Sequence, residues 1–338
     1  MTPLPGNAVT LPAVDHRPTL AELEPLARAA LAHHGIIAVE LQNLRYYNNA
    51  TYRVVAGDGR QFVLRVTCNH HGEARLRSEM QWLRAMQSDP GVRVPDPVVT
   101  LAGQLMLKTS APSVPEPRWC NVFHWLDGMT IAEAQMNAHD FGLVGAASAH
   151  LHQSSAAFDP APGFDRPSWD EGFSLDRDGN GTLEPIIAYL RGHLTNEAIN
   201  QFVLLAEQGR GLMSRLRLDP LGYGLIHADL HAGNCLFRND GVAFLDFEDL
   251  SWGYFLYDVA TALFGSIERP DYIDLTEAFT TAYARIRPLP ADFAQQLRLF
   301  QVLRAVFLTN LAVTRHDPRE NAWWEGYVVS KLRRLLHS

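Results

Sequence analysis

One stretch, residues 225–250, constrains the fold of this chain more than any other part of it. It contains a polar cluster of the form H-x-D-x-x-x-x-N, made by His227, Asp229 and Asn234, and a second cluster that begins at Asp246. Apolar residues on either side of an Asn-Asp-Gly turn separate the two clusters, which predicts a β-hairpin. Because the turn lies midway between Asn234 and Asp246, the strand ends should meet and bring these residues side by side. An amide oxygen beside a carboxylate is typical of a site for a hard cation such as Mg²⁺.

Three motifs in this order, HADLHAGN, LDFED and YDVA, resemble those of the aminoglycoside phosphotransferase and choline kinase superfamily, including its homoserine-kinase-like members. The resemblance implies an ATP-dependent kinase with an α+β, protein-kinase-like fold of two lobes. One lobe is a small antiparallel β-sheet and the other is larger and mainly helical. By position, Asp229 would be the base that orients the acceptor hydroxyl, and His227 would brace the loop. Asn234 and Asp246 would be the magnesium ligands, and Asp258 would hold the backbone of the catalytic loop.

Residues 36–66 are predicted to form three strands, and the first link between them lies where a kinase covers the phosphates of ATP. This link, residues 45–50, contains no glycine. Asn48 and Asn49 could still cradle phosphate, because asparagine tolerates left-handed backbone and offers side-chain N–H groups. The alternative is that the link is only a hairpin turn.

The resemblance also places Arg65 where related kinases carry a lysine on the third strand. Arginine keeps its positive charge and can grip phosphate oxygens with two nitrogens. Glu79, on a predicted helix over residues 72–86, lies where the family has a glutamate that pairs with this cation. The alternative for Glu79 is a solvated side chain. If Arg65 does not anchor the nucleotide, Lys108 is the next candidate.

A last strand running into a bend near residue 124 resembles the hinge between the two lobes of a kinase. By position, the His124 carbonyl and the Leu126 amide would bind the adenine. The predicted organisation is a proline-rich leader and two lobes, with boundaries at residues 1–18, 19–123 and 124–338.

The acceptor should be a small molecule. Protein kinases place a peptide along a long activation segment, but Asp246 and Asp258 leave only 11 residues between them, 247–257. Trp169, in an insert after the hinge, is then a plausible wall of the acceptor pocket, or it merely packs that insert onto the lobe. Glu248 and Asp249 would face the acceptor or a second metal.

Composition excludes several other classes of protein. A net charge of −8 argues against general nucleic-acid binding. No apolar run reaches membrane-spanning length, and no signal-peptide pattern is present, so we expect a cytoplasmic protein without a membrane partner. Three cysteines without C-x-x-C spacing suit a reducing compartment.

His150 and His152 lie two residues apart on a predicted helix, so they should be packing or surface residues and not a metal pair.

Three functions are compatible with these features. The first is a magnesium- and ATP-dependent kinase acting on an amino alcohol, amino acid, sugar or aminoglycoside. The second is a Ser/Thr protein kinase of the bacterial stress-response type. The third is a nucleotide-binding pseudokinase, against which the intact Asp229, Asn234 and Asp246 argue. The oligomeric state is left open.

Overall fold

The computed structural model of the protein describes residues 18–46, 49–67, 72–170, 183–315 and 318–337. The chain divides into two compact units. As far as they are described, residues 1–71 and 97–125 form the first, and residues 72–96 and 126–338 form the second.

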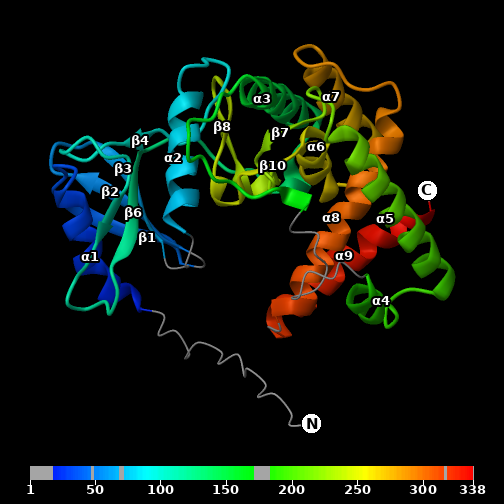
Figure 1. The fold of residues 1–338 in the computed structure, drawn as a ribbon, viewed down its shortest axis with the longest axis horizontal. Coiled ribbons are helices and arrows are strands. Elements are labelled where there is room, and N and C mark those ends of the chain that lie inside the picture. The colour runs from blue at the N-terminus through cyan, green and yellow to red at the C-terminus, as the bar shows by residue number, and fades with distance from the viewer. Residues whose placement is uncertain (1–17, 47–48, 68–71, 171–182, 316–317, 338) are drawn as a thin grey trace, which may run out of the picture. The chain divides into compact units, whose positions relative to one another are not determined.

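The first unit is an antiparallel sheet with helix α1 (Leu20–Ala32) packed on one face (Figure 1). Thr19 begins the helix with a capping box, since its hydroxyl accepts the Glu22 N–H and the Glu22 carboxylate accepts the Thr19 N–H. The strand order is β1-β2-β3-β6-β4, with β5 paired to β6. The strands are β1 (Ala38–Tyr46), β2 (Asn49–Ala56), β3 (Gln61–Thr67), β4 (Pro97–Val98), β5 (Leu107–Thr109) and β6 (Arg118–His124).

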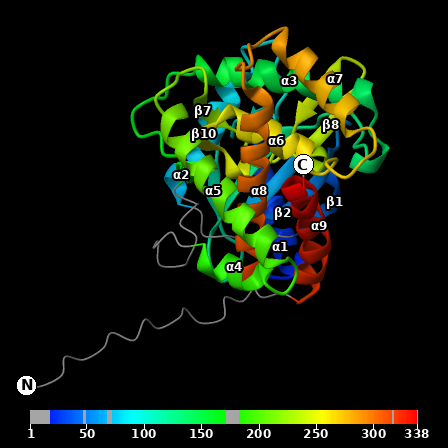
Figure 2. The ribbon, with the colours of Figure 1, turned by 90° about the vertical axis from the view of Figure 1, so that its right-hand side faces the viewer.

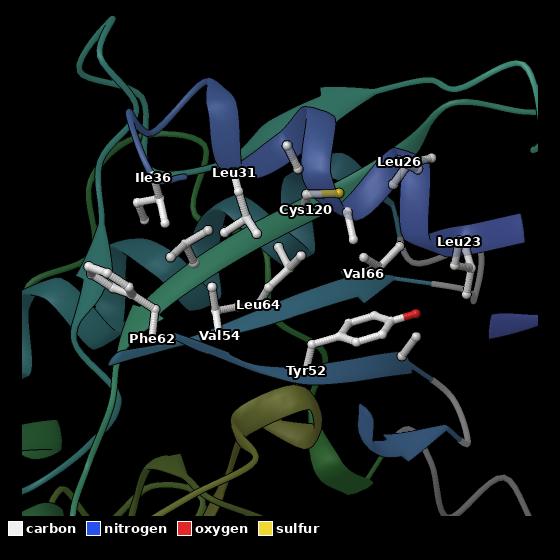
Figure 3. Close-up of a cluster of buried hydrophobic side chains, with 14 of the residues drawn as sticks. Leu23, Leu26, Leu31, Ile36, Tyr52, Val54, Phe62, Leu64, Val66 and Cys120 are labelled. Atoms are coloured by element: carbon white, nitrogen blue, oxygen red, sulfur yellow. The ribbon is translucent and has the colours of Figure 1, made fainter. Parts of the chain in front are cut away.

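The core of the first unit lies between the sheet and α1. Alternation along the strands sends every second side chain to this face. Figure 3 shows the resulting cluster, which includes Leu23, Leu26, Leu31, Tyr52, Val54, Phe62, Leu64, Val66 and Cys120. The same alternation places Arg65 on the opposite face, where its guanidinium lies 5.4 Å from the centre of the Phe123 ring.

The second unit is mainly helical. Its α-helices in the described ranges are α2 (Glu73–Met86), α3 (Ala138–Ala156), α4 (Glu184–Leu190), α5 (Asn196–Leu216), α6 (Phe255–Phe264), α7 (Tyr272–Ala284), α8 (Phe293–Arg315) and α9 (Pro318–His337). Helix α3 lies along α7 in Figures 1 and 2. Gly145 permits this close approach, because a Cβ there would meet the Phe279 carbonyl oxygen at 2.2 Å. None of the helices within the described ranges is long and apolar enough to cross a membrane.

Helix α2 belongs to the second unit, whereas the sequence-based division assigned residues 72–96 to the first lobe. Its Trp82 ring lies 5.0 Å from that of Phe247, which directly follows Asp246. The Arg93 carbonyl, which follows the helix, accepts the Phe244 N–H at 2.9 Å. These contacts explain why the helix groups with the catalytic stretch. The lobe boundaries themselves stay predictions.

The predicted hairpin is confirmed. Strand β8 (Cys235–Arg238) pairs antiparallel with β9 (Gly241–Phe244), in a register that sets Cys235 opposite Phe244. A second pair, β7 (Tyr223–Ile226) with β10 (Ser251–Tyr254), was not predicted from the sequence. Its two strands flank the hairpin in sequence, so the loop before the hairpin starts from this ribbon and the loop after the hairpin returns to it. The α+β, kinase-like fold class is likewise confirmed.

Candidate active site

The catalytic loop leaves β7 in a constrained conformation. Ala228 has φ = 68°, a left-handed value that is unfavourable for a residue with a Cβ. Asp258 stabilises it from the first turn of α6: its fully buried carboxylate accepts the backbone N–H groups of His227 and Ala228 at 2.8 Å each. These two bonds fix the loop backbone directly before Asp229. They are the contacts that the sequence predicted for Asp258, while its part in activity stays a prediction.

His227 connects this loop to the end of the hairpin. Its Nδ1 accepts the Asp229 N–H at 3.3 Å, so this nitrogen carries no proton. The proton is on Nε2, which donates to the Leu245 carbonyl at 2.8 Å. The Leu245 N–H in turn donates to the Asn234 carbonyl at 2.9 Å. The imidazole therefore links the Asp229 backbone to the strand end that leads to Asp246.

Asp229 carries partners on both carboxylate oxygens. Oδ1 lies 2.6 Å from Nη2 of Arg304, and Oδ2 lies 3.3 Å from Nε2 of His231. Burial by itself would raise the pKa of Asp229. The charge of Arg304 and the hydrogen bond and charge of His231 outweigh burial, and they hold the pKa well below its usual range. Asp229 is thus an anionic acceptor of hydrogen bonds, 30% exposed on its side chain.

Asn234 and Asp246 offer oxygen atoms suited to Mg²⁺. The side-chain nitrogen of Asn234 donates to the Asp229 carbonyl at 2.9 Å, which leaves the amide oxygen of Asn234 as its remaining ligand atom. Asp246 directly follows Leu245, adopts φ = 64° and exposes its side chain. Within the described ranges, no three His, Cys, Asp or Glu side chains gather into a metal-binding group. Two protein ligands fit Mg²⁺, which commonly completes its shell with phosphate oxygens and water.

The segment after Asp246 is held through its backbone carbonyls. The buried Arg166 donates to the carbonyls of Glu248, at 2.5 Å, and of Leu250. Asp249 exposes its side chain, yet desolvation by the surrounding protein, followed by the charges of Asp229, Glu248 and Asp246, raises its pKa to about 6. Four acidic side chains therefore act on one small region, which favours cationic groups there.

Trp169 lies behind this region and not on an open surface. It is 6% exposed, and its ring centre lies 3.7 Å from that of Tyr257 and 6.4 Å from that of Tyr254. This burial agrees with the alternative in which Trp169 packs the insert onto the lobe. A direct contact of Trp169 with the acceptor stays a prediction.

The predicted nucleotide-binding residues are divided between the two units. Arg65, Asn49 and His124 belong to the first, and Glu79 and Leu126 to the second. Asn48 lies outside the described residues. Arg65 is 8% exposed and Glu79 is 1% exposed. The burial of Glu79 excludes the alternative that its side chain is solvated. The pairing of Glu79 with Arg65 stays a prediction.

Two contributors to the site were missed from the sequence. His152 of α3 is fully buried; its Nε2 lies 3.2 Å from Oδ2 of Asp258 and its Nδ1 lies 2.8 Å from the hydroxyl of Tyr283. Burial lowers the pKa of His152, so the ring is neutral and donates from Nε2 to Asp258. Arg304 is the second. A signal for it was present, because a single arginine interrupts the apolar run at residues 302–308, and buried arginines are rare without a partner.

A two-lobed fold with a catalytic loop and hairpin of this kind is typical of kinases. A model of the phosphotransferase enzyme family matches residues 41–289, well over half of the chain. The chain belongs to this family, and it is an enzyme that phosphorylates small molecules.

Three named proteins illustrate the likeness. The amicoumacin kinase of Bacillus subtilis is 26% identical over 278 residues, which cover 78% of this chain and 75% of that protein. The structure of a microcompartment-associated aminopropanol kinase matches with a TM-score of 0.72 and 27% identity, over 91% of this chain and 95% of that one. A spectinomycin phosphotransferase, with a TM-score of 0.63 and 14% identity over 92% and 97% of the two chains, shows the likeness of fold alone.

Proposed function

We propose that the protein transfers the γ-phosphate of ATP to the hydroxyl of a small amino alcohol, or of another cationic or zwitterionic alcohol. The observation that carries the proposal is the arrangement around Asp229. An anionic carboxylate, a pair of oxygen ligands for Mg²⁺ and further acids lie on one short segment of chain. The names of the two relatives above, an aminopropanol kinase and an amicoumacin kinase, support this class of reaction.

In this mechanism the chain mainly positions and neutralises charge. Asp229 would accept the hydrogen bond of the attacking hydroxyl and so direct its oxygen toward the phosphorus. Asn234 and Asp246 would hold Mg²⁺, and the ion when bound neutralises the phosphate oxygens. Arg65 would bind phosphate oxygens. Glu248 and Asp249 would attract the ammonium group of the acceptor, which raises its local concentration at the base.

The test is a screen of purified protein with magnesium and ATP against a panel of alcohols, measured as stimulated release of ADP. Amino alcohols, homoserine, sugars and aminoglycosides represent the acceptor classes, and matched amines without a hydroxyl are the control. We expect an amino alcohol or other charged alcohol to stimulate release, and casein and myelin basic protein to accept little phosphate. Strong labelling of these proteins with no response to any alcohol would favour the stress-response protein kinase instead.

A further inference from the structure

Two adjacent residues of α6 restrain the catalytic loop at different points. Asp258 holds the loop backbone through two N–H groups, as described above. Tyr257 contacts Arg304 of α8, and Arg304 contacts the carboxylate of Asp229. We propose that Arg304, anchored by Tyr257, is a positioning residue that fixes the Asp229 carboxylate for the acceptor hydroxyl. This inference rests on the proposed function, because it takes Asp229 as the group that receives that hydroxyl.

The guanidinium has little freedom to move. Arg304 is 5% exposed, and its Nη1 donates to the Tyr257 hydroxyl at 3.0 Å while its Nη2 donates to Oδ1 of Asp229 at 2.6 Å. The Phe307 ring lies 5.5 Å from the guanidinium carbon. Tyr257 is fully buried, and the Trp169 ring packs on it with the ring centres 3.7 Å apart and the planes tilted by 39°. The anchor is therefore rigid from Trp169 through to Asp229.

An arginine suits this task better than a lysine does. Its planar fork presents two nitrogens in a fixed relation, so one can bind the phenol oxygen while the other binds the carboxylate. The bond to Asp229 joins two charged groups, and such bonds are shorter and stronger than neutral ones. A lysine in place of Arg304 keeps the charge, but its donors all lie on one nitrogen at the end of a flexible stem, so it cannot hold the two partners in the fixed relation of the fork.

The two oxygens of Asp229 then have different roles. Oδ1 faces the buried Arg304, whose side chain is 7% exposed, and it is fixed. Oδ2 faces His231, whose side chain is 42% exposed and whose contact is longer, at 3.3 Å. A hydroxyl arriving from solvent can displace the exposed imidazole but not the buried guanidinium. We therefore assign Oδ2 as the atom that receives the acceptor, with Oδ1 and Arg304 setting its direction.

The experiment compares Arg304→Lys and Tyr257→Phe with Arg298→Lys. Arg298 lies on the same helix and also makes two hydrogen bonds, at 3.1 Å and 2.7 Å, but both go to the Leu335 carbonyl. With an accepted alcohol, Arg304→Lys should lower kcat by about 10- to 100-fold, because misplacing a reacting group costs on this order, while the KM for ATP changes by less than about 3-fold. Tyr257→Phe, which keeps the charge and removes the anchor, should lower kcat by a smaller factor. Arg298→Lys should resemble wild type.

A second readout does not depend on the identity of the acceptor. Crystal structures of Arg304→Lys and Tyr257→Phe should show the Asp229 carboxylate rotated from its wild-type orientation, with Asp258 still bound to the loop backbone. A kcat near wild type in both variants, or an unmoved carboxylate in both, overturns the inference. If Arg304→Lys does not fold, Tyr257→Phe decides alone. Failure of every alcohol with the wild-type protein would refute the proposed function, whereas the orientation of Asp229 would still be measured.

Discussion

Replacing Asp258 by asparagine should destabilise the second unit and disable the loop at once. The buried carboxylate accepts three hydrogen bonds, from the N–H groups of His227 and Ala228 and from Nε2 of His152. Asparagine keeps one acceptor oxygen and turns an NH₂ group toward at least one of these donors. Losing one bond to a charged acceptor, with its donor left buried, costs about 2–3 kcal/mol. Because Ala228 is held at a left-handed φ, the loop should relax once the bond is lost.

The assay is equilibrium unfolding in urea, followed by tryptophan fluorescence, together with steady-state turnover. We expect a lower urea midpoint with an unchanged slope, and kcat reduced about 100-fold as Asp229 loses its place. Asp240→Asn is the matched control, since Asp240 is exposed in the hairpin turn and contacts only arginines among its described ion pairs. It should leave both measurements near wild type. If Asp258→Asn has the urea midpoint and the kcat of wild type, the three hydrogen bonds do not hold the loop.

The remaining predictions concern four charged side chains. Asp229→Asn should leave ATP binding near wild type and remove most turnover, because this group acts on the hydroxyl; comparable turnover would refute the assignment. Asp246→Ala should abolish the magnesium dependence of ATP affinity in a binding titration, and an unchanged dependence would identify another carboxylate as the ligand. Arg65→Ala should weaken ATP binding or transfer and Arg65→Lys should retain part of the activity, whereas wild-type behaviour of the alanine variant would move the anchor elsewhere. The pKa of Asp249 is about 6 in the folded protein and about 4 when unfolded, so its contribution to the free energy of unfolding falls as pH rises between these values. In metal-free urea unfolding, Asp249→Asn should remove this pH dependence of the free energy of unfolding. An unaltered pH profile in the variant would contradict the prediction.

The part of the site that is close in sequence was predictable. Asn234 and Asp246 are joined by a hairpin whose turn chemistry and alternation are visible in the chain, so their proximity followed from local rules. The same holds for helix α1, whose capping box begins at Thr19. Local patterns of this kind carry their own geometry, because a turn type and a strand period fix which residues meet.

The parts that depend on packing were not predictable in the same way. Arg304 and Asp229 are 75 residues apart, and nothing in either segment specifies that α8 lies against α6. His152 looked like a packing residue because its partners, Asp258 and Tyr283, are more than 100 residues away. The pair β7–β10 was missed for a related reason, since residues 227–250 separate its two strands and no turn joins them directly.

The hairpin β8–β9 also bears on the order in which the protein folds. A hairpin closes within microseconds because its contacts are local, whereas a contact across 75 residues must wait for the helices to dock. The half of the site that would bind Mg²⁺ should therefore form before the half that orients the base. In pulsed hydrogen exchange during refolding, the Leu245 amide, which is bonded to Asn234, should become protected before the amides of α8. A folding intermediate of this chain would then already hold Asn234 beside Asp246 while Asp229 still rotates freely.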